Sequence, residues 1–407
     1  MLLPIDFYGI SIAGVSVRLY MFFGLLLLIL NVSKLKLLIN QKHLSLMIIA
    51  ILLLFLVDFV NGLQLASFLQ HMMFAVAFGC ALIYLACIKS MDEINEMMDV
   101  LVATALGFSV IFMIAVICKL NGFEIAGVST VSPSLPYTEG IIREMSGSTF
   151  GRLRGFQIDP NLLGASLLPA TTISLYRLLN KTKEWKRHLI QVILSYFCGY
   201  YTNSRMALAL FILAPVIIIL CFLKKERMLF RVKTVLGSIG IVLFIFLFFL
   251  FYSEPLLNGF ENFLSDYETR ANFADEAGRG TIWLLNLKEM VNTNLLAGVG
   301  QGQIRNYTSV DCHNTWVEFI VGDGIIVGIF LIYFFGSVLF SCIRCSKKFP
   351  RDHNLTILAV GYSCILFSLT SIDSITNSNL IFLACIILWY ISQIEYNAAK
   401  QINVNST

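Results

Sequence analysis

The chain has 407 residues, of which 57% are hydrophobic and only 13% are charged. That balance excludes an ordinary soluble globular protein and indicates a chain that crosses a membrane many times. The formal net charge of +4 matters less than where the charges lie. We expect no cleavable signal peptide, because the first residues lack a basic region and the first apolar stretch is long enough to stay in the membrane.

Long apolar segments recur along the chain and predict an all-α polytopic membrane protein with about eleven transmembrane helices (ten to twelve), each near the ~20 residues that a bilayer core requires. The first span is the least defined, because residues 1–14 are also apolar and could form a half-helix or a further span. In chain order the predicted spans are 15–35, 44–62, 68–88, 100–120, 161–179, 189–202, 206–223, 235–252, 325–343, 355–370 and 379–394.

Most of the 29 lysines and arginines fall in connections on one side of these spans. The positive-inside rule makes that side cytoplasmic, which puts the N-terminus outside and the C-terminus inside if there are eleven spans. Residues 1–252 then form a transmembrane bundle of about eight spans, with an outer loop at 121–158. Residues 253–322 form a large periplasmic loop, and residues 323–407 form the C-terminal spans and a short cytoplasmic tail.

The polar segment 253–322 is far longer than an ordinary connection and is not of low complexity, which favours a functional role. We expect part of it to fold as an amphipathic helix, because apolar residues recur there at helical spacing. These are Trp283, Leu284, Leu287, Met290 and Val291.

Arginine greatly outnumbers lysine on the predicted outer face. Its planar fork binds phosphate bidentately, whereas lysine acts as a point charge. Arginines here oppose the topological preference, so we expect bound phosphate to hold at least two of them. The alternative is that they reach lipid headgroups or pair with nearby carboxylates. The outer arginines are Arg143, Arg152, Arg154, Arg205, Arg270, Arg279 and Arg305.

Two short elements open predicted spans on that face. Asp159 before Pro160 suits a helix start, where Asp159 is simply the N-cap, although Arg152 and Arg154 could hold an anion beside it. At the second element Ser204 has the same capping role. Arg205 would lie at the membrane–water boundary, where an arginine requires a partner or a ligand phosphate.

Within the large segment, Arg279 precedes the amphipathic helix. A run of glycines, Gly298-Val-Gly-x-Gly302, allows close backbone approach but does not match a nucleotide-binding loop. His313 is the best-placed outer histidine, and a neutral imidazole can accept a proton from a hydroxyl nucleophile. It could equally be hydrogen-bonded at a helix start, because Asn314, Trp316 and Glu318 follow it.

Other classes of site have little support. The ten cysteines show no disulfide framework, and the Cys342/Cys345 pair has no second pair or histidine at zinc-ligand spacing. We find no motif of a protease, an esterase or a metal-dependent transferase on the outer side. We expect no metal or other cofactor. Asp58 inside the second span could indicate a proton-coupled carrier, but we see no clear chain of intramembrane partners for it.

The order of the outer-face motifs resembles the O-antigen polymerase and ligase family of bacterial inner membranes (Wzy-type polymerases and WaaL-type ligases). The resemblance covers about residues 150–335. It rests on Arg154-Gly-Phe-x2-Asp-Pro-Asn161, Asn203-Ser-Arg205-Met-Ala, Gly278-Arg-x3-Trp283, the glycine run, His313-Asn314 and Gly324-Ile-Ile-Val-Gly328. It implies a glycosyltransferase fold of the C type and a multi-pass protein of the inner membrane with its large loop in the periplasm.

The resemblance also implies the chemistry. The substrate would be a glycan on undecaprenyl diphosphate, and transfer to an acceptor glycan or to lipid A–core would be inverting and metal-independent. Membrane lipids and a chain-length regulator would be partners, and nucleic acid would not. Arg205 and Arg279 would bind the diphosphate, with Arg270 competing for the role of Arg279, and His313 would orient or deprotonate the acceptor hydroxyl. Further substrate-binding candidates are Arg152, Arg154, Asp159, Asn161, Asn314 and Glu318.

Polymerase and ligase remain separate alternatives. A polymerase joins one lipid-linked repeat unit to a growing chain, and the Gly155-Phe-x2-Asp-Pro-Asn161 element and the loop 121–158 favour it. A ligase moves the finished chain to lipid A–core, and the histidine before asparagine in the large loop favours that reaction. A non-enzymatic carrier of polysaccharide or lipid is the third possibility.

Overall fold

The computed structural model describes most of the chain, with gaps. The described residues are 9–12, 15–31, 33, 42–88, 90–120, 142–143, 152–153, 160–180, 182–202, 204–225, 279–308, 311–349, 352–372 and 378–405. The predicted span 235–252, most of the outer loop 121–158 and the first part of the large segment, 253–278, lie outside them.

Helices dominate this part of the chain. The elements are α1 Leu19–Asn31, α2 Lys42–Val60, α3 Leu65–Cys87, α4 Met91–Leu120, α5 Pro160–Leu179, α6 Trp185–Tyr201, α7 Arg205–Lys225, α10 Arg279–Thr293, α11 Ile304–Thr308, α12 Thr315–Lys348, α13 His353–Ser368 with a 3-10 turn Leu369–Ser371, and α14 Ser378–Asn405. Two small antiparallel hairpins, β1 Gly9–Ile12 with β2 Val15–Arg18 and β3 Ile142–Arg143 with β4 Arg152–Leu153, depart from an all-α chain.

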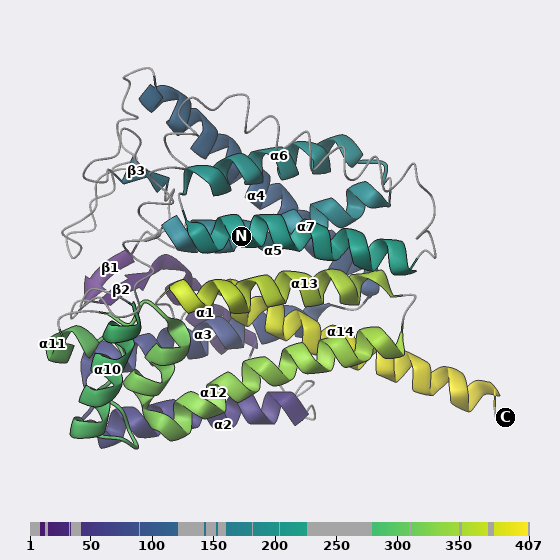
Figure 1. Ribbon diagram of the computed structural model, residues 1–407. Coiled ribbons are helices and arrows are strands. Elements are labelled where there is room, and N and C mark those ends of the chain that lie inside the picture. The colour runs from purple at the N-terminus through teal and green to yellow at the C-terminus, as the bar shows by residue number, and fades with distance from the viewer. Residues whose placement is uncertain are drawn as a thin grey trace.

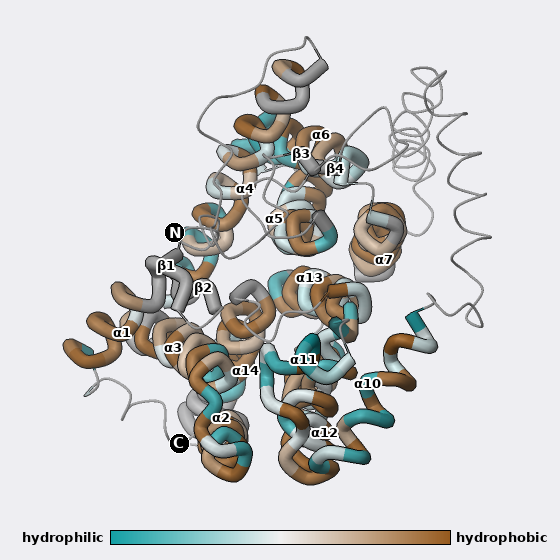
Figure 2. Tube along the Cα trace, turned by 90° about the vertical axis from the view of Figure 1, so that its left-hand side faces the viewer, coloured by the Kyte–Doolittle hydropathy of each residue, from teal (hydrophilic) through white to brown (hydrophobic). Residues whose placement is uncertain are grey.

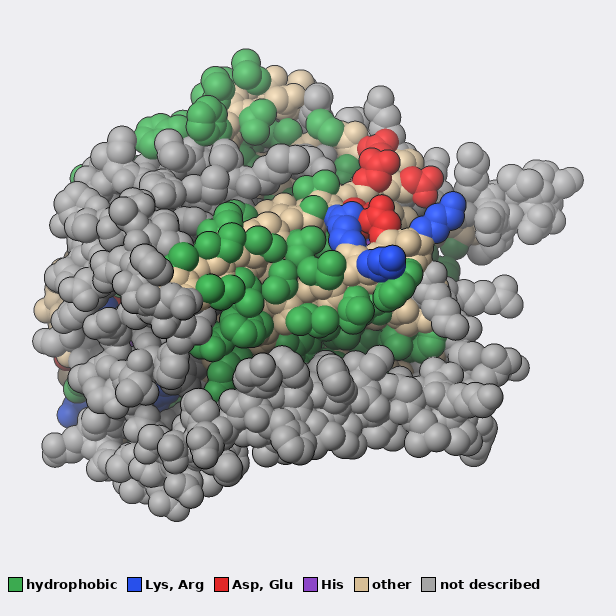
Figure 3. All heavy atoms as spheres, turned by 90° about the horizontal axis from the view of Figure 1, so that it is seen from above, with side chains coloured by type: hydrophobic (Ala, Val, Ile, Leu, Met, Phe, Trp, Pro, Cys, Tyr) green, Lys and Arg blue, Asp and Glu red, His purple; other side chains and the backbone are tan. Residues whose placement is uncertain are grey.

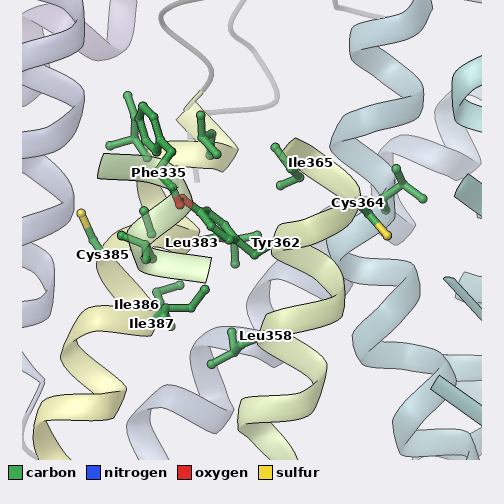
Figure 4. Packing of buried hydrophobic residues seen from close by; sticks show 14 of the residues in the cluster. Phe335, Leu358, Tyr362, Cys364, Ile365, Leu383, Cys385, Ile386 and Ile387 are labelled. Atoms are coloured by element: carbon green, nitrogen blue, oxygen red, sulfur yellow. The ribbon is translucent and has the colours of Figure 1, made fainter. Parts of the chain in front are cut away.

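The long helices run side by side as a bundle, and α13 is at its centre (Figures 1 and 2). It packs against α5 and α7 on one side and against α12 and α14 on the other. The shared core is apolar. In Figure 4 the ring of Tyr362 on α13 points towards Phe335 on α12, and its hydroxyl donates to the Phe335 carbonyl at 3.2 Å. The bundle therefore encloses most of α13.

Five described helices are long and apolar enough to cross a membrane. They contain the stretches Leu65–Ile83, Asp92–Ile114, Asn161–Leu179, Thr315–Lys348 and Asn354–Ser371. Shorter apolar helices occur at Phe22–Asn31, Ser45–Val60, Met206–Phe222 and Leu380–Glu395. After the first, the predicted spans that lie within the described residues fall on helices. A polytopic membrane protein is consistent with this.

Of residues 1–14, which could form a half-helix or a further span, the structure describes 9–12, and these form a strand. Instead of a half-helix, β1 and β2 pair antiparallel with Gly9 opposite Arg18 and Ile12 opposite Val15. The first predicted span therefore begins as a strand. The helix that follows, α1, has 13 residues, which extend about 20 Å, less than the ~30 Å of a bilayer core.

The two ends of the bundle differ. One end carries α10, α11 and the hairpin β1–β2 (Figure 1). At the other end, charged side chains gather on the face seen in Figure 3, while hydrophobic side chains lie along the rest of its described surface. The ion pairs Arg187–Glu184 and Arg177–Asp99 belong to this second end, between the chain ends of α4, α5 and α6.

Candidate functional site

The predicted amphipathic helix is α10, and Arg279 is its first residue. The Arg279 side chain is exposed, at the end of the bundle that also carries α11 and the start of α12. The helix rests on α12 through a small core that includes Met290, Val299, Cys312 and Val321. Packing therefore fixes where Arg279 lies relative to the bundle.

A single side-chain contact brings α10 and His313 together. The Trp283 indole N–H donates to the carbonyl of Cys312 at 2.8 Å, and Cys312 is directly followed by His313. Arg279 lies four residues before Trp283, about 6 Å along a helix axis. The structure thus brings Arg279 and His313, which are 34 positions apart in the sequence, to the same end of the bundle.

His313 has a left-handed backbone, with φ of 50°. Few residues other than glycine adopt this conformation, and such outliers concentrate at functional sites. The side chain is exposed, whereas Cys312 and Asn314 on either side are buried. The backbone therefore turns His313 outward between two fixed neighbours.

Asn314 is the N-cap of α12, because its side-chain oxygen accepts from the N–H groups of Trp316 at 3.0 Å and Val317 at 3.3 Å. The next two residues tie this start to the end of α13. The Thr315 hydroxyl donates to the Ile372 carbonyl at 2.6 Å, and the Trp316 indole donates to the Leu366 carbonyl at 3.2 Å. Glu318 is buried in the same first turns of α12.

The starts of α5 and α7 also lie together. A Cβ on Gly164 of α5 would meet Ala207 of α7 at 2.5 Å, so the two helices pack closely near their first turns. Pro160 is the first residue of α5, as predicted, and Asn161 follows it. Ser204 caps α7 by accepting the Ala207 N–H at 3.2 Å, which confirms its predicted capping role.

The remaining described candidates, Arg205 and Arg152, lie on or beside these helices. Arg205 is the first residue of α7, and Arg152 begins β4, a strand that contacts α5 and α6. Three candidates, Arg154, Asp159 and Arg270, lie outside the described residues. One outer arginine follows the alternative interpretation, because Arg305 forms an ion pair with Asp311.

The glycine run approaches another backbone closely, as the sequence indicated. Gly298, Gly300 and Gly302 all have positive φ. The N–H groups of Val299 and Gly300 donate to the carbonyls of Val321 and Gly322 on α12, both at 2.9 Å. The run is therefore a docking loop against α12.

Only part of the apolar face of α10 packs on the protein. Met290 is buried, but Leu284 is 70% exposed and Val291 is 58% exposed. The polar Asn286 is buried instead, and its side-chain oxygen accepts from the Thr308 hydroxyl at 2.5 Å. An exposed apolar stripe therefore begins one turn after Arg279.

Asp58, for which the sequence shows no clear chain of intramembrane partners, has two buried partners in the structure. Its carboxylate accepts from the Ser67 hydroxyl at 2.6 Å and lies 2.7 Å from Nδ1 of His71. His71 in turn reaches Asp323, a residue that the sequence had not drawn attention to. The spacing of Ser67 and His71, one helical turn apart and just after an intramembrane carboxylate, was the available signal.

Part of the chain matches a known family. Residues 190–332 match the model of the family Wzy_C, described as O-Antigen ligase. The matched segment runs from α6 through α10 and α11 into α12, and it contains Arg205, Arg279 and His313. No curated protein matches the chain.

Proposed function

We propose that this chain polymerises lipid-linked polysaccharide repeat units, because residues 190–332 match the model of the Wzy_C family of O-antigen ligase domains, shared by Wzy polymerases and WaaL ligases. Enzymes of that family transfer glycans as O-antigen ligases or polymerases, and the long apolar helices of this chain suit a multi-pass membrane protein. The reaction we propose takes place on the periplasmic face, with a glycan on undecaprenyl diphosphate as donor. About eleven spans in a C-type glycosyltransferase fold are part of the same proposal.

One observation carries the proposal for the site. The hydrogen bond from Trp283 to the Cys312 carbonyl brings the first turn of α10 beside the turn that exposes His313. A fixed arginine and an exposed imidazole at one end of a membrane bundle suit an anionic leaving group and a hydroxyl nucleophile. Arg205 opens α7 in the same matched segment, and the starts of α5 and α7 pack against each other.

The reaction step follows from these roles. The acceptor hydroxyl oxygen attacks the anomeric carbon of the donor sugar, and His313 takes the hydroxyl proton. The bond between the anomeric carbon and the phosphate oxygen breaks, and its electron pair leaves with undecaprenyl diphosphate. Attack opposite the leaving group inverts the anomeric centre. Arg279 and Arg205 neutralise the charge that develops on the diphosphate, where fixed cations help most.

The exposed face of α10 suits a substrate that is part lipid. Leu284, Leu285 and Val291 are all exposed apolar residues within the three turns that follow Arg279. A cation beside an apolar surface matches a diphosphate attached to a polyprenyl chain. A diphosphate alone would need only the cation, and a polyprenyl chain alone would need only the apolar surface.

A ligase is the second candidate, and the His313–Asn314 pair at the start of α12 favours it. The element leading to Asn161 and the long outer loop favour the polymerase. A carrier has lost its main support, because Asp58 lies in the last turn of α2 and its described partners tie helix ends together. No described contact extends this cluster into a path across the bundle.

The decisive experiment uses the purified full chain in lipid vesicles with undecaprenyl-diphosphate-linked repeat units. A ladder of longer lipid-linked glycans without any further acceptor is the result expected of a polymerase. Product that forms only when lipid A–core is added would establish the ligase and overturn the polymerase. Neither product, from protein that is monodisperse and folded, would contradict both enzymes.

A further inference from the structure

A closed ring of buried polar side chains joins the α2–α3 turn to the matched domain. His71 lies between two carboxylates, with Nδ1 2.7 Å from Oδ2 of Asp58 and Nε2 2.9 Å from Oδ1 of Asp323. Gln301 donates its side-chain amide to Oδ2 of Asp323 at 3.3 Å and its backbone N–H to the Ser67 hydroxyl at 3.2 Å. Ser67 donates to Oδ1 of Asp58 and closes the ring.

Every carboxylate oxygen of the ring has a hydrogen-bonding partner within the ring. Two carboxylates present four oxygens, and each oxygen receives one donor from Ser67, His71 or Gln301. His71 satisfies both Asp58 and Asp323 only if both ring nitrogens carry protons. All five side chains are 1% exposed or less. Removing one member therefore leaves a buried charge or acceptor without its partner, which is costly.

The ring lies where two backbones dock. Gly324 has φ of 82° and ψ of 164°, and this breaks α12 directly after Asp323. The break frees the carbonyls of Val321 and Gly322 to accept from the docking loop, and the Ile325 N–H donates instead to the Leu295 carbonyl at 3.1 Å. Gln301 belongs to the loop and Asp323 to the break, so the ring fastens both to α2 and α3.

We propose that this ring is a positioning device, in which His71 holds the docking loop and the break in α12 on the α2–α3 turn and thereby sets where Arg279 and His313 lie. The proposal rests on the proposed function for its catalytic consequence. Its structural half, the docking of residues 295–302, does not depend on which reaction the protein carries out.

Helix α10 links the ring to the candidate site, and contacts fix the chain near both ends of this helix. The ring and the Asn61 side chain, which donates to the Ala297 carbonyl at 2.9 Å, fix the chain just after α10. Trp283 fixes the first turns of α10 to Cys312. Asp323 lies nine residues after Asn314 in the same helix, about 13 Å along its axis. Loosening the ring therefore frees both segments that carry the candidate groups.

His71 and His188 form a matched pair for the test. Both are histidines on helices, both are 1% exposed, and each loses a similar volume when replaced by alanine. His188 lies on α6 at the charged end of the bundle, where Nδ1 is 3.4 Å from the Ser174 hydroxyl. We expect His71→Ala to speed hydrogen exchange of the amides of residues 299–301 and 325 by about tenfold to a hundredfold, and His188→Ala to leave them unchanged.

Transfer of lipid-linked glycan is measured on the same samples. We expect the His71→Ala enzyme to lose about tenfold to a hundredfold in kcat/KM, with His188→Ala close to the wild-type protein. Faster exchange without loss of transfer would overturn the positioning role. Unchanged exchange, or equal effects in both variants, would overturn the ring as a docking device. A wild-type chain without transfer would count against the proposed function, and exchange would still decide the docking.

A conservative variant separates positioning from general damage. Asp323→Asn keeps an oxygen for His71, and its new amide can donate to the Gln301 side-chain oxygen, which has no described partner, if Gln301 turns its amide over. We expect Asp323→Asn to retain exchange protection and most transfer, and Asp323→Ala to lose both. If His71→Ala does not fold, Gln301→Ala removes one donor only and gives the same comparison in milder form. Equal loss in the two Asp323 variants would contradict the ring.

Discussion

The two ends of the bundle use the same kinds of polar residue in opposite ways. At the end that carries α10, Asp58, His71 and Asp323 are fully buried and each carboxylate oxygen has one donor. At the charged end, Lys348 pairs with Glu395 between two exposed side chains, and the half-buried Arg187 pairs with the exposed Glu184. Buried pairs are costly to break, whereas exposed pairs contribute about 0–1 kcal/mol.

The charged end serves to orient the chain in the membrane, whereas the α10 end holds residues in precise positions. Basic residues at the charged end need only be on one side of the membrane, so their partners are incidental and their exact positions matter little. The α10 end must hold a helix, a loop and a helix start in one arrangement, so its contacts are buried and join segments far apart in the sequence. The experiments below compare a residue at the α10 end with a matched residue elsewhere in the bundle.

The largest effect is expected at Arg279, the exposed arginine that begins α10. We expect Arg279→Ala to lower glycan transfer about a hundredfold to a thousandfold, because it removes a fixed cation from the leaving diphosphate. Arg279→Lys keeps the charge but loses the planar fork, so an intermediate loss is expected.

Arg344 is the matched control, because it is also exposed on a helix but lies near the opposite end of α12. Arg344→Ala should transfer glycan at the wild-type rate in the same vesicle assay. Equal activities of the Arg279 and Arg344 variants would remove Arg279 from the site and leave Arg270 as the candidate loop arginine.

The next largest effect is expected at two glycines of α12. A Cβ on Gly324 would lie 2.0 Å from the Leu296 carbonyl oxygen, and its backbone region is adopted almost only by glycine. Gly324→Ala should therefore destabilise the protein by at least ~2 kcal/mol. A Cβ on Gly336 would meet nothing within 4 Å, so Gly336→Ala should be neutral or slightly stabilising. Thermal unfolding in detergent compares them, and equal midpoints would contradict the docked break.

Local rules recovered the helix starts from sequence. Pro160 and Ser204 follow residue-type preferences that act within one turn, and both lie where those preferences put them. The N-terminal hairpin was missed because overall apolarity was given more weight than pattern. Ile10, Ser11 and Ile12 lie opposite Val17, Ser16 and Val15, and this apolar–polar alternation with a period of two indicates a strand.

Long-range contacts could not be predicted in this way. His71 and Asp323 are 252 residues apart, and no local pattern pairs them. Periodicity predicted α10 as a helix, but which side is buried depends on its neighbours. Asn286 is buried because Thr308 supplies a hydroxyl donor, while Leu284 stays exposed. The candidate site was therefore predictable as a set of residues on one face, and the ring that supports it was not.

The smallest effect is expected for two helix caps of the same design. Asn314 caps α12 and Asp352 caps α13, and each side chain accepts two backbone N–H groups at 3.0 and 3.3 Å. Either alanine variant should cost about 1 kcal/mol of stability, as lost N-caps do. Asp352→Ala should cost somewhat more, because the carboxylate also accepts from the Tyr390 hydroxyl.

The two cap variants should differ in their rates of glycan transfer, although they lose similar stability. Asn314 holds the turn that exposes His313, so Asn314→Ala should lower transfer about tenfold, since a change of about 1.4 kcal/mol in positioning is a factor of ten. Asp352 lies at the charged end, so its alanine variant should keep its transfer rate despite its lower unfolding midpoint. If the two variants lose transfer in proportion to stability, the ends do not differ in function, and the exposed turn at His313 is only the start of a helix.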